Sequence, residues 1–153
     1  MLEKSLKAIR LKDLLFVILY GVFLPTLLGI LVGLIDYFLR DALNFTLGNI
    51  LFWGVAIFTG KWVRRQYETP HLLYAILAGI GIFFSAMIIH TIPVFYALNG
   101  VGFQEIFDLR VYFSVMILVM NPISWIQNFS LDLALWLLIL FVGTYLGVKR
   151  TIE

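Results

Sequence analysis

The 153-residue chain contains no cysteine. This absence excludes disulfide scaffolds, thiolate metal sites, iron–sulfur clusters and thiol chemistry. Charge is also scarce, because Asp, Glu, Lys and Arg make up only 13% of the residues, whereas soluble domains contain about a quarter. A soluble globular domain is therefore not expected.

Motifs that carry chemistry are missing as well. The sequence has no GxSxG, HExxH, P-loop, CxxC or GxGxxG pattern, and no acid lies in the middle of an apolar run. We therefore assign no catalytic, cofactor-binding or metal-binding residue and expect no cofactor. An enzyme is disfavoured.

Apolar residues dominate what is present. They make up 62% of the chain and give it a mean hydropathy of +1.01. The net charge is +2, but the basic residues lie at the ends of apolar runs, where they orient membrane proteins. This pattern indicates an all-α integral membrane protein with no nucleic-acid partner.

Four apolar runs are long enough to cross a bilayer, which takes about 20 residues. We predict one membrane domain, residues 1–153, with four transmembrane helices at about 14–35, 43–63, 72–98 and 131–148. A short charged turn with Asp36, Arg40 and Asp41 is expected after the first helix. Pro93 is expected to kink or end the third.

Residues 1–12 are amphipathic and predict a cytoplasmic interfacial helix, although an ordinary basic flank explains them equally well. Five basic residues are expected at the surface of anionic lipid: Lys4, Lys7, Lys12, Arg64 and Arg65.

The segment 99–130 is harder to interpret. Residues 103–110 predict an interfacial amphipathic helix, and the apolar run 111–120 is too short to cross alone. Asn121-Pro122 then interrupts the run. We expect 99–130 to be an external amphipathic or re-entrant hairpin between the third and fourth transmembrane helices. The alternative is five transmembrane helices, with 111–128 crossing the membrane.

The basic residues favour four spans. With four spans, nine lysines and arginines face the cytoplasm and only Arg40 and Arg110 lie outside. With five spans, Lys149 and Arg150 move outside, against the positive-inside rule. The expected location is the cell membrane, with both termini cytoplasmic.

Small residues four apart recur in three predicted helices and favour close helix packing. They pack either inside this chain or against a partner or a second copy. These residues are Gly29, Gly33, Ala75, Gly79, Gly143 and Gly147.

A candidate polar site collects the few polar groups expected at or near membrane depth. Its members are His90, Asn121, Gln127, Asn128 and Asp132. His90 lies within a predicted helix, where an ionisable group is a functional candidate, although a structural hydrogen-bonding role is favoured. Asp132 fits the first turn of the last helix, where negative charge meets the helix dipole.

These features favour a small non-enzymatic membrane subunit that acts by helix–helix association within a larger membrane complex. The expected partners are membrane lipid and either an integral membrane protein or further copies of the chain. One alternative is an oligomeric transporter or channel for a small solute or ion. A second alternative is an intramembrane lipid-modifying enzyme that uses His90 in acid–base catalysis.

Overall fold

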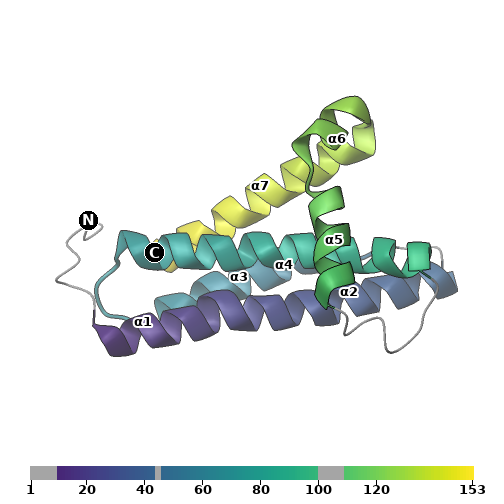
Figure 1. Cartoon of the computed structure of the whole chain (residues 1–153). Helices are drawn as coiled ribbons and strands as arrows, with labels where there is room; N and C mark the ends of the chain where they lie inside the picture. Colours follow the sequence, from purple (N-terminus) through teal and green to yellow (C-terminus); the bar gives the residue numbers. More distant parts are fainter. Residues whose placement is uncertain (1–9, 44–45, 100–108) are drawn as a thin grey trace.

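The computed structural model describes residues 10–43, 46–99 and 109–153, and these parts form helices (Figure 1). Among the described residues, three helices are long and apolar enough to cross a membrane: Leu11–Leu43, Leu72–Tyr96 and Leu131–Ile152. The predicted all-helical, membrane type of fold is thereby confirmed. Residues 1–9 and 100–108, which include Lys4, Lys7 and most of the predicted interfacial helices, lie outside the described residues.

The first helix is continuous over 33 residues but contains one wide turn. It consists of α1 (Leu11–Ile18), a π-helical turn η2 (Leu19–Phe23) and α2 (Leu24–Leu43). The helix therefore extends eight residues beyond the predicted end at residue 35. Asp36, Arg40 and Asp41 lie within its last turns and not in a connecting loop.

Pro25 explains the wide turn. Proline has no N–H to donate to the carbonyl four residues earlier, which here belongs to Gly21, and such breaks often produce a π-helical turn. The Gly21 carbonyl faces Gly81 so closely that any side chain at position 81 would collide with it. The wide turn is therefore also a point of tight helix contact.

Helix α3 (Gly48–Arg64) follows a short connection, and α4 (Leu72–Asn99) follows a second one. His71 is buried before α4, and its Nδ1 accepts a hydrogen bond from the Leu73 N–H at 3.1 Å. Helix α4 continues through Pro93, so this proline does not end the helix.

Two short helices precede the last long one. They are α5 (Leu109–Val119) and α6 (Pro122–Gln127), with Asn121 between them. The Asn121 Oδ1 accepts a hydrogen bond from the Ile123 N–H at 3.0 Å and thereby caps α6. Helices α5 and α6 are called the hairpin below.

Helix α7 (Leu131–Ile152) completes the chain. Its N-cap is Ser130, whose Oγ accepts a hydrogen bond from the Leu133 N–H at 3.2 Å. Asp132 lies in its first turn, and Lys149 and Arg150 lie in its last turn. This distribution of charge stabilises both ends of the helix dipole.

The helices run up and down along one bundle, in which α7 lies obliquely (Figure 1). The start of α1, the start of α4 and the end of α7 lie at the same end, which we call the basic end. The end of α2 and the end of α4 lie at the opposite end, which we call the hairpin end. Helix α5 crosses α4 there, and α6 lies away from α1 and α2.

Glycines allow α3 and α7 to pack closely. A Cβ atom at Gly143 would lie 2.5 Å from the Phe52 Cε1, and one at Gly147 would lie 2.8 Å from the Ala56 carbonyl oxygen. These distances are too short for any side chain. Both glycines of the α7 pair are therefore used in contacts within the chain.

The small residues of α2 and α4 also face other parts of the same chain. A Cβ at Gly29 would lie 3.0 Å from the Ser85 backbone, and one at Gly33 would lie 2.8 Å from the Ile92 Cδ1. A Cβ at Gly79 would lie 3.1 Å from the Val148 side chain, and Ala75 is buried. The small-residue positions thus contribute to packing within one bundle.

The described residues form three core clusters, of which the smallest lies on α4 and includes Ile92 and Phe95, and two larger ones lie along the bundle. The largest one joins α2, α3, α4 and α7 and includes Val32, Phe52, Ile82, Met87 and Leu140. The cluster nearer the basic end includes Val17, Val63, Tyr67, Tyr74 and Ala78. Large apolar side chains also cover much of the outward surface of the helices, as expected where lipid is the solvent.

Candidate functional site

A buried carboxylate organises the hairpin end of the bundle. Asp36 of α2 is fully buried, and its Oδ1 accepts hydrogen bonds from the backbone N–H groups of Leu47 and Gly48, both at 2.7 Å. The first N–H groups of a helix have no partner within the helix. Asp36 therefore caps α3 from a neighbouring helix, and its charge meets the positive end of the α3 dipole.

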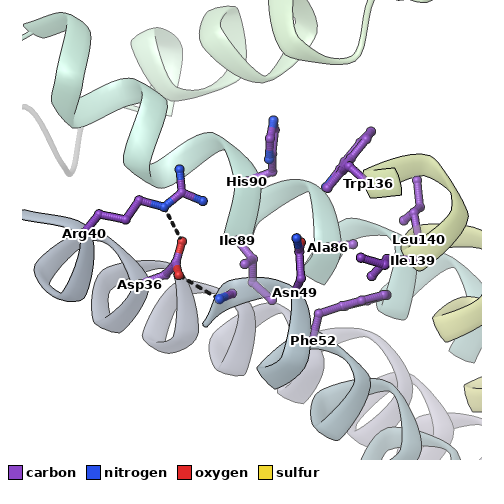
Figure 2. A pocket seen from close by; sticks show the side chains of 11 residues that line it. Asp36, Arg40, Asn49, Phe52, Ala86, Ile89, His90, Trp136, Ile139 and Leu140 are labelled. Atoms are coloured by element: carbon purple, nitrogen blue, oxygen red, sulfur yellow. Dashed lines mark hydrogen bonds and ion pairs between the residues drawn. The ribbon is translucent and has the colours of Figure 1, made fainter. Parts of the chain in front are cut away.

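Arg40 and Thr46 complete this network, and Figure 2 shows the Asp36–Arg40 pair. The Arg40 Nε lies 2.8 Å from the Asp36 Oδ2, and the Thr46 hydroxyl donates to the Asp36 Oδ1 at 3.0 Å. The Arg40 Nη2 donates to the Thr46 Oγ1 at 3.2 Å. Because Asp36 is buried and Arg40 is half-exposed, the pair connects the interior of the bundle with its surface.

An open groove lies beside this network, between α3 and the first half of α7. Its volume is about 700 Å³. One wall is polar and comes from the ends of α2 and α3, whereas the other is mainly apolar and comes from α7. The lining residues are Arg40, Thr46, Asn49, Asp132, Leu135, Trp136 and Ile139.

A small cavity of about 10 Å³ adjoins the groove, close to the space that one water molecule needs. Asp36, Asn49, His90 and Trp136 all contribute to its lining. The His90 ring of α4 lies against the Trp136 indole of α7, with 4.8 Å between the ring centres. Figure 2 shows these side chains arriving from α2, α3, α4 and α7.

Two of the five candidate polar residues lie in this region. His90 lines the cavity and Asp132 lines the groove, and the two spaces share four lining residues: Arg40, Asn49, Trp136 and Ile139. In the described part of the chain, no hydrogen bond links His90 to Asp36 or Asp132. The arrangement thus contains groups for binding but lacks a formed acid–base pair.

The other three candidates lie in or next to α6, and two of them make local hydrogen bonds. Asn121 caps α6, and the Asn128 Nδ2 donates to the Ser124 carbonyl oxygen at 3.1 Å. Asn121, Gln127 and Asn128 are all exposed. They do not line the groove or the cavity.

Tryptophans connect the hairpin to the cavity. The Trp125 indole of α6 packs edge-on against Trp136, with 5.9 Å between ring centres. Its Nε1 also donates to the Val119 carbonyl oxygen at 2.7 Å. Trp136 also contacts His90, so three rings connect α4, α7 and the hairpin.

Sequence reasoning missed the importance of Asp36, Arg40, Asn49 and Trp136. The four-residue spacing of Asp36 and Arg40 is a signal for an ion pair on one helix face. It would have been informative if the first helix had been extended beyond residue 35. No comparable signal in the sequence brings Asn49 and Trp136 together, because they lie 87 positions apart on different helices.

A resident metal ion finds no support in this region. Among the residues that the structure describes, no group of three His, Cys, Asp or Glu side chains lies close enough to hold a metal ion. Asp36 is already engaged by backbone donors and by Arg40.

Basic side chains gather at the opposite end of the molecule. Arg64 and Arg65 lie at the end of α3, near Arg150 of α7, and Lys12 lies at the start of α1. Arg64 is held in place because its Nη1 donates to the Tyr67 carbonyl oxygen at 3.0 Å. Its guanidinium lies 5.4 Å from the centre of the Tyr67 ring.

No protein-family model, curated protein or solved structure gives a significant match to this chain.

Proposed function

We propose that this chain is a non-enzymatic subunit of a larger complex in the cell membrane. In this proposal it has four transmembrane helices and cytoplasmic termini, and it binds a larger integral membrane protein through its hairpin and the groove beside α7. The observation that carries the proposal is the exposed apolar surface of the hairpin, which is too short to cross a membrane.

The hairpin needs cover from protein. Helix α5 has 11 residues, which gives it a length of about 17 Å against about 30 Å of hydrocarbon. Its Ile117 and Leu118 are exposed, as are Ile123 and Ile126 of α6. A chain that turns back at membrane depth is tolerated where protein covers its free backbone groups.

The first half of α7 extends the same surface. Leu131, Leu135 and Leu138 recur at helical spacing and are all exposed, and Leu135 also lines the groove. A transmembrane helix of the partner fits this surface, with its apolar side against α7 and a polar group near Arg40 and Asp132.

A second copy of this chain fits the groove less well. In a two-fold symmetric pair, the same surface must supply both the groove and the element that fills it, whereas a different protein needs to supply only the filling helix. A convex helix of a different protein fills the groove directly.

The basic end supports four spans over five. Lys61, Arg64 and Arg65 of α3 line one pocket together with Arg150 of α7. The two helices therefore end on the same side of the bundle, as four crossings require. This arrangement also follows the bias of lysine and arginine toward the cytoplasm.

Helix α3 is the shortest proposed span. Its 17 residues cover about 26 Å, slightly less than a typical hydrocarbon core. It packs against α2, α4 and α7, so neighbouring helices shield much of its surface from lipid. A short span of this kind is accommodated by local thinning of the bilayer.

Site-specific photo-crosslinking tests the proposal. A photoreactive residue is placed at Ile126 or Leu135, which are 79% and 51% exposed, or at the control position Leu27 of α2, which is 63% exposed. In native membranes we expect one larger integral membrane protein to crosslink at Ile126 and Leu135 but not at Leu27. The same protein should co-purify in fixed stoichiometry.

Alanine variants supply an independent measurement. Leu135→Ala together with Ile126→Ala should weaken co-purification by roughly tenfold, as for loss of central interface contacts, whereas Leu27→Ala should not. A chain that purifies only as copies of itself, with no adduct at either position, would contradict the subunit proposal. That result would favour the transporter alternative.

A further inference from the structure

Two helix ends converge at the basic end and form a pocket of about 260 Å³. Lys61, Arg64 and Arg65 come from the end of α3, and Arg150 and Glu153 come from the end of α7. Four cationic side chains and one carboxylate therefore surround the same small space.

Tight packing one turn earlier fixes this convergence. A Cβ atom at Gly60 would collide with the Gly147 carbonyl oxygen and would lie 2.8 Å from the Arg150 Cβ. Helices α3 and α7 are thus nearly in backbone contact just before their basic ends. The two sets of cations cannot separate unless this contact is lost.

The charges in the pocket are only partly neutralised. Glu153 lies 3.2 Å from the Lys149 Nζ and 3.7 Å from the Arg150 Nη1. Within the described residues, no ion pair includes Lys61, Arg64 or Arg65. Like charges this close repel each other, so an anion in the pocket would stabilise the arrangement.

We propose that this pocket binds the phosphate of an anionic phospholipid headgroup. Arginine guanidinium groups match the geometry of phosphate oxygens, and lysine adds a compact charge. Basic pockets between transmembrane helices at the cytoplasmic side are suited to such headgroups.

The adjoining surface favours a lipid over free phosphate. Phe58 lies one turn before Lys61 on α3 and is exposed, and its ring stacks on Trp62 with 5.7 Å between centres. Tyr145 of α7 is also exposed. Aromatic rings of this kind lie at the membrane interface, and the exposed apolar surface beside the pocket can contact the acyl chains.

A simpler explanation is that the cations only stabilise the ends of two helices. Positive side chains in a last turn interact favourably with the helix dipole. That effect acts on each helix separately and does not depend on a shared pocket. It predicts no preference for one class of lipid and no difference between the pocket and other basic residues at this end.

Native mass spectrometry of the full chain tests the proposal. The protein is released from detergent in the presence of phosphatidylglycerol, phosphatidylcholine or inorganic phosphate. We expect one phosphatidylglycerol to be retained per chain, with phosphatidylcholine at least tenfold weaker. If inorganic phosphate at equal concentration abolishes the retention of phosphatidylglycerol, the proposal that the ligand is a lipid is overturned.

Matched charge variants locate the site. Lys61→Gln with Arg65→Gln should reduce retention about thirtyfold, which corresponds to about 2 kcal/mol for the two charges together. Arg10→Gln with Lys12→Gln removes the same charge at the same end, and retention should remain within about twofold. If both double variants lose retention equally, the lipid is attracted by the overall charge of this end, and the proposal of a specific pocket is overturned.

A variant on α7 shows whether the α3 variants lose retention only because they misfold. Arg150→Gln leaves α3 intact and should also reduce retention of phosphatidylglycerol. The thermal midpoint of each variant in detergent identifies any loss of fold. A folded Arg150→Gln protein with unchanged retention would contradict the proposal that α3 and α7 share one site.

Discussion

Asp36 and Arg40 form an ion pair of 2.8 Å within α2, yet Asp36 is fully buried and Arg40 is half-exposed. The same carboxylate receives the first backbone N–H groups of α3. One side chain therefore connects the end of α2 to the start of the next helix, and it also lines the small cavity beside the groove.

Removal of this carboxylate should destabilise the bundle. Asp36→Ala leaves the N–H groups of Leu47 and Gly48 without their acceptor and Arg40 without its partner, at a cost of about 3 kcal/mol. Asp36→Asn retains one acceptor oxygen and should cost about half as much. Unfolding in mixed micelles with increasing SDS measures both free energies.

Asp41→Ala is the matched control, because Asp41 is an exposed acid on the same helix. Its effect should stay within about 0.5 kcal/mol. If Asp36→Ala were as mild as this control, the capping role of Asp36 would be wrong.

Close packing of α3 against α7 predicts different costs for two glycines. Gly147→Val places atoms against the Ala56 carbonyl and the Ile82 side chain and should destabilise the protein by about 2 kcal/mol. Gly54→Ala meets no atom within 4 Å and should be neutral or stabilising by about 0.5 kcal/mol. Thermal unfolding in detergent compares the two, and similar midpoints would argue against the α3–α7 contact.

The hairpin should loosen when one hydrogen bond is removed. Trp125→Phe keeps an aromatic ring near Trp136 but loses the donor to the Val119 carbonyl oxygen. We expect hydrogen exchange in α5 and α6 to accelerate about fivefold, the equivalent of about 1 kcal/mol. Trp53→Phe, which removes a longer bond of 3.3 Å to Ile139, should leave the exchange of the hairpin unchanged.

Tyr67 secures the end of α7 to the connection between α3 and α4. Its hydroxyl donates to the Thr151 carbonyl oxygen, and the side chain is buried. Tyr67→Phe should therefore lower the free energy of unfolding by about 1 kcal/mol at neutral pH. Tyr145→Phe, an exposed position on α7, serves as the control and should have no measurable effect.

The same tyrosine predicts a dependence on alkaline pH. Burial raises the pKa of Tyr67 above its ordinary value, more than its hydrogen bond to Thr151 and the charge of Arg64 lower it. The stability that this shift contributes is complete below the ordinary tyrosine pKa, about 10, and is lost as the pH rises through the raised value. Wild type should therefore lose stability more steeply than Tyr67→Phe above about pH 10. Parallel curves would show that Tyr67 is not buried in the folded protein.

The sequence predicted the helical, membrane type of fold because long apolar runs with basic ends leave few alternatives. It also indicated the break at Asn121-Pro122, which separates α5 from α6. These features depend on local composition and on residues with restricted backbones, and both can be recognised without tertiary structure.

The environment of Asp36 could not be predicted in the same way. An acid after an apolar run usually indicates the membrane surface, so Asp36 was expected in an exposed turn. Its burial depends on donors from Leu47, Gly48 and Arg40, which only the folded chain brings together. Asn121 and Asn128 show the opposite error. The sequence suggested that these polar residues form a site, but their side chains make hydrogen bonds only to nearby backbone groups.

The wide turn at Leu19–Phe23 has a consequence for Asp36, which lies more than three turns away. Across the wide turn the buried positions of the first helix recur every four residues, at Val17, Gly21, Pro25 and Gly29, and beyond it they are Val32, Gly33 and Asp36. A straight α-helix repeats every 3.6 residues, so this spacing drifts by about 40° per turn. One extra residue in the wide turn corrects about 100° of that drift. The wide turn therefore restores the side of the helix that faces the bundle. Without it, the part of the helix that carries Asp36 would be rotated, and the carboxylate would face lipid.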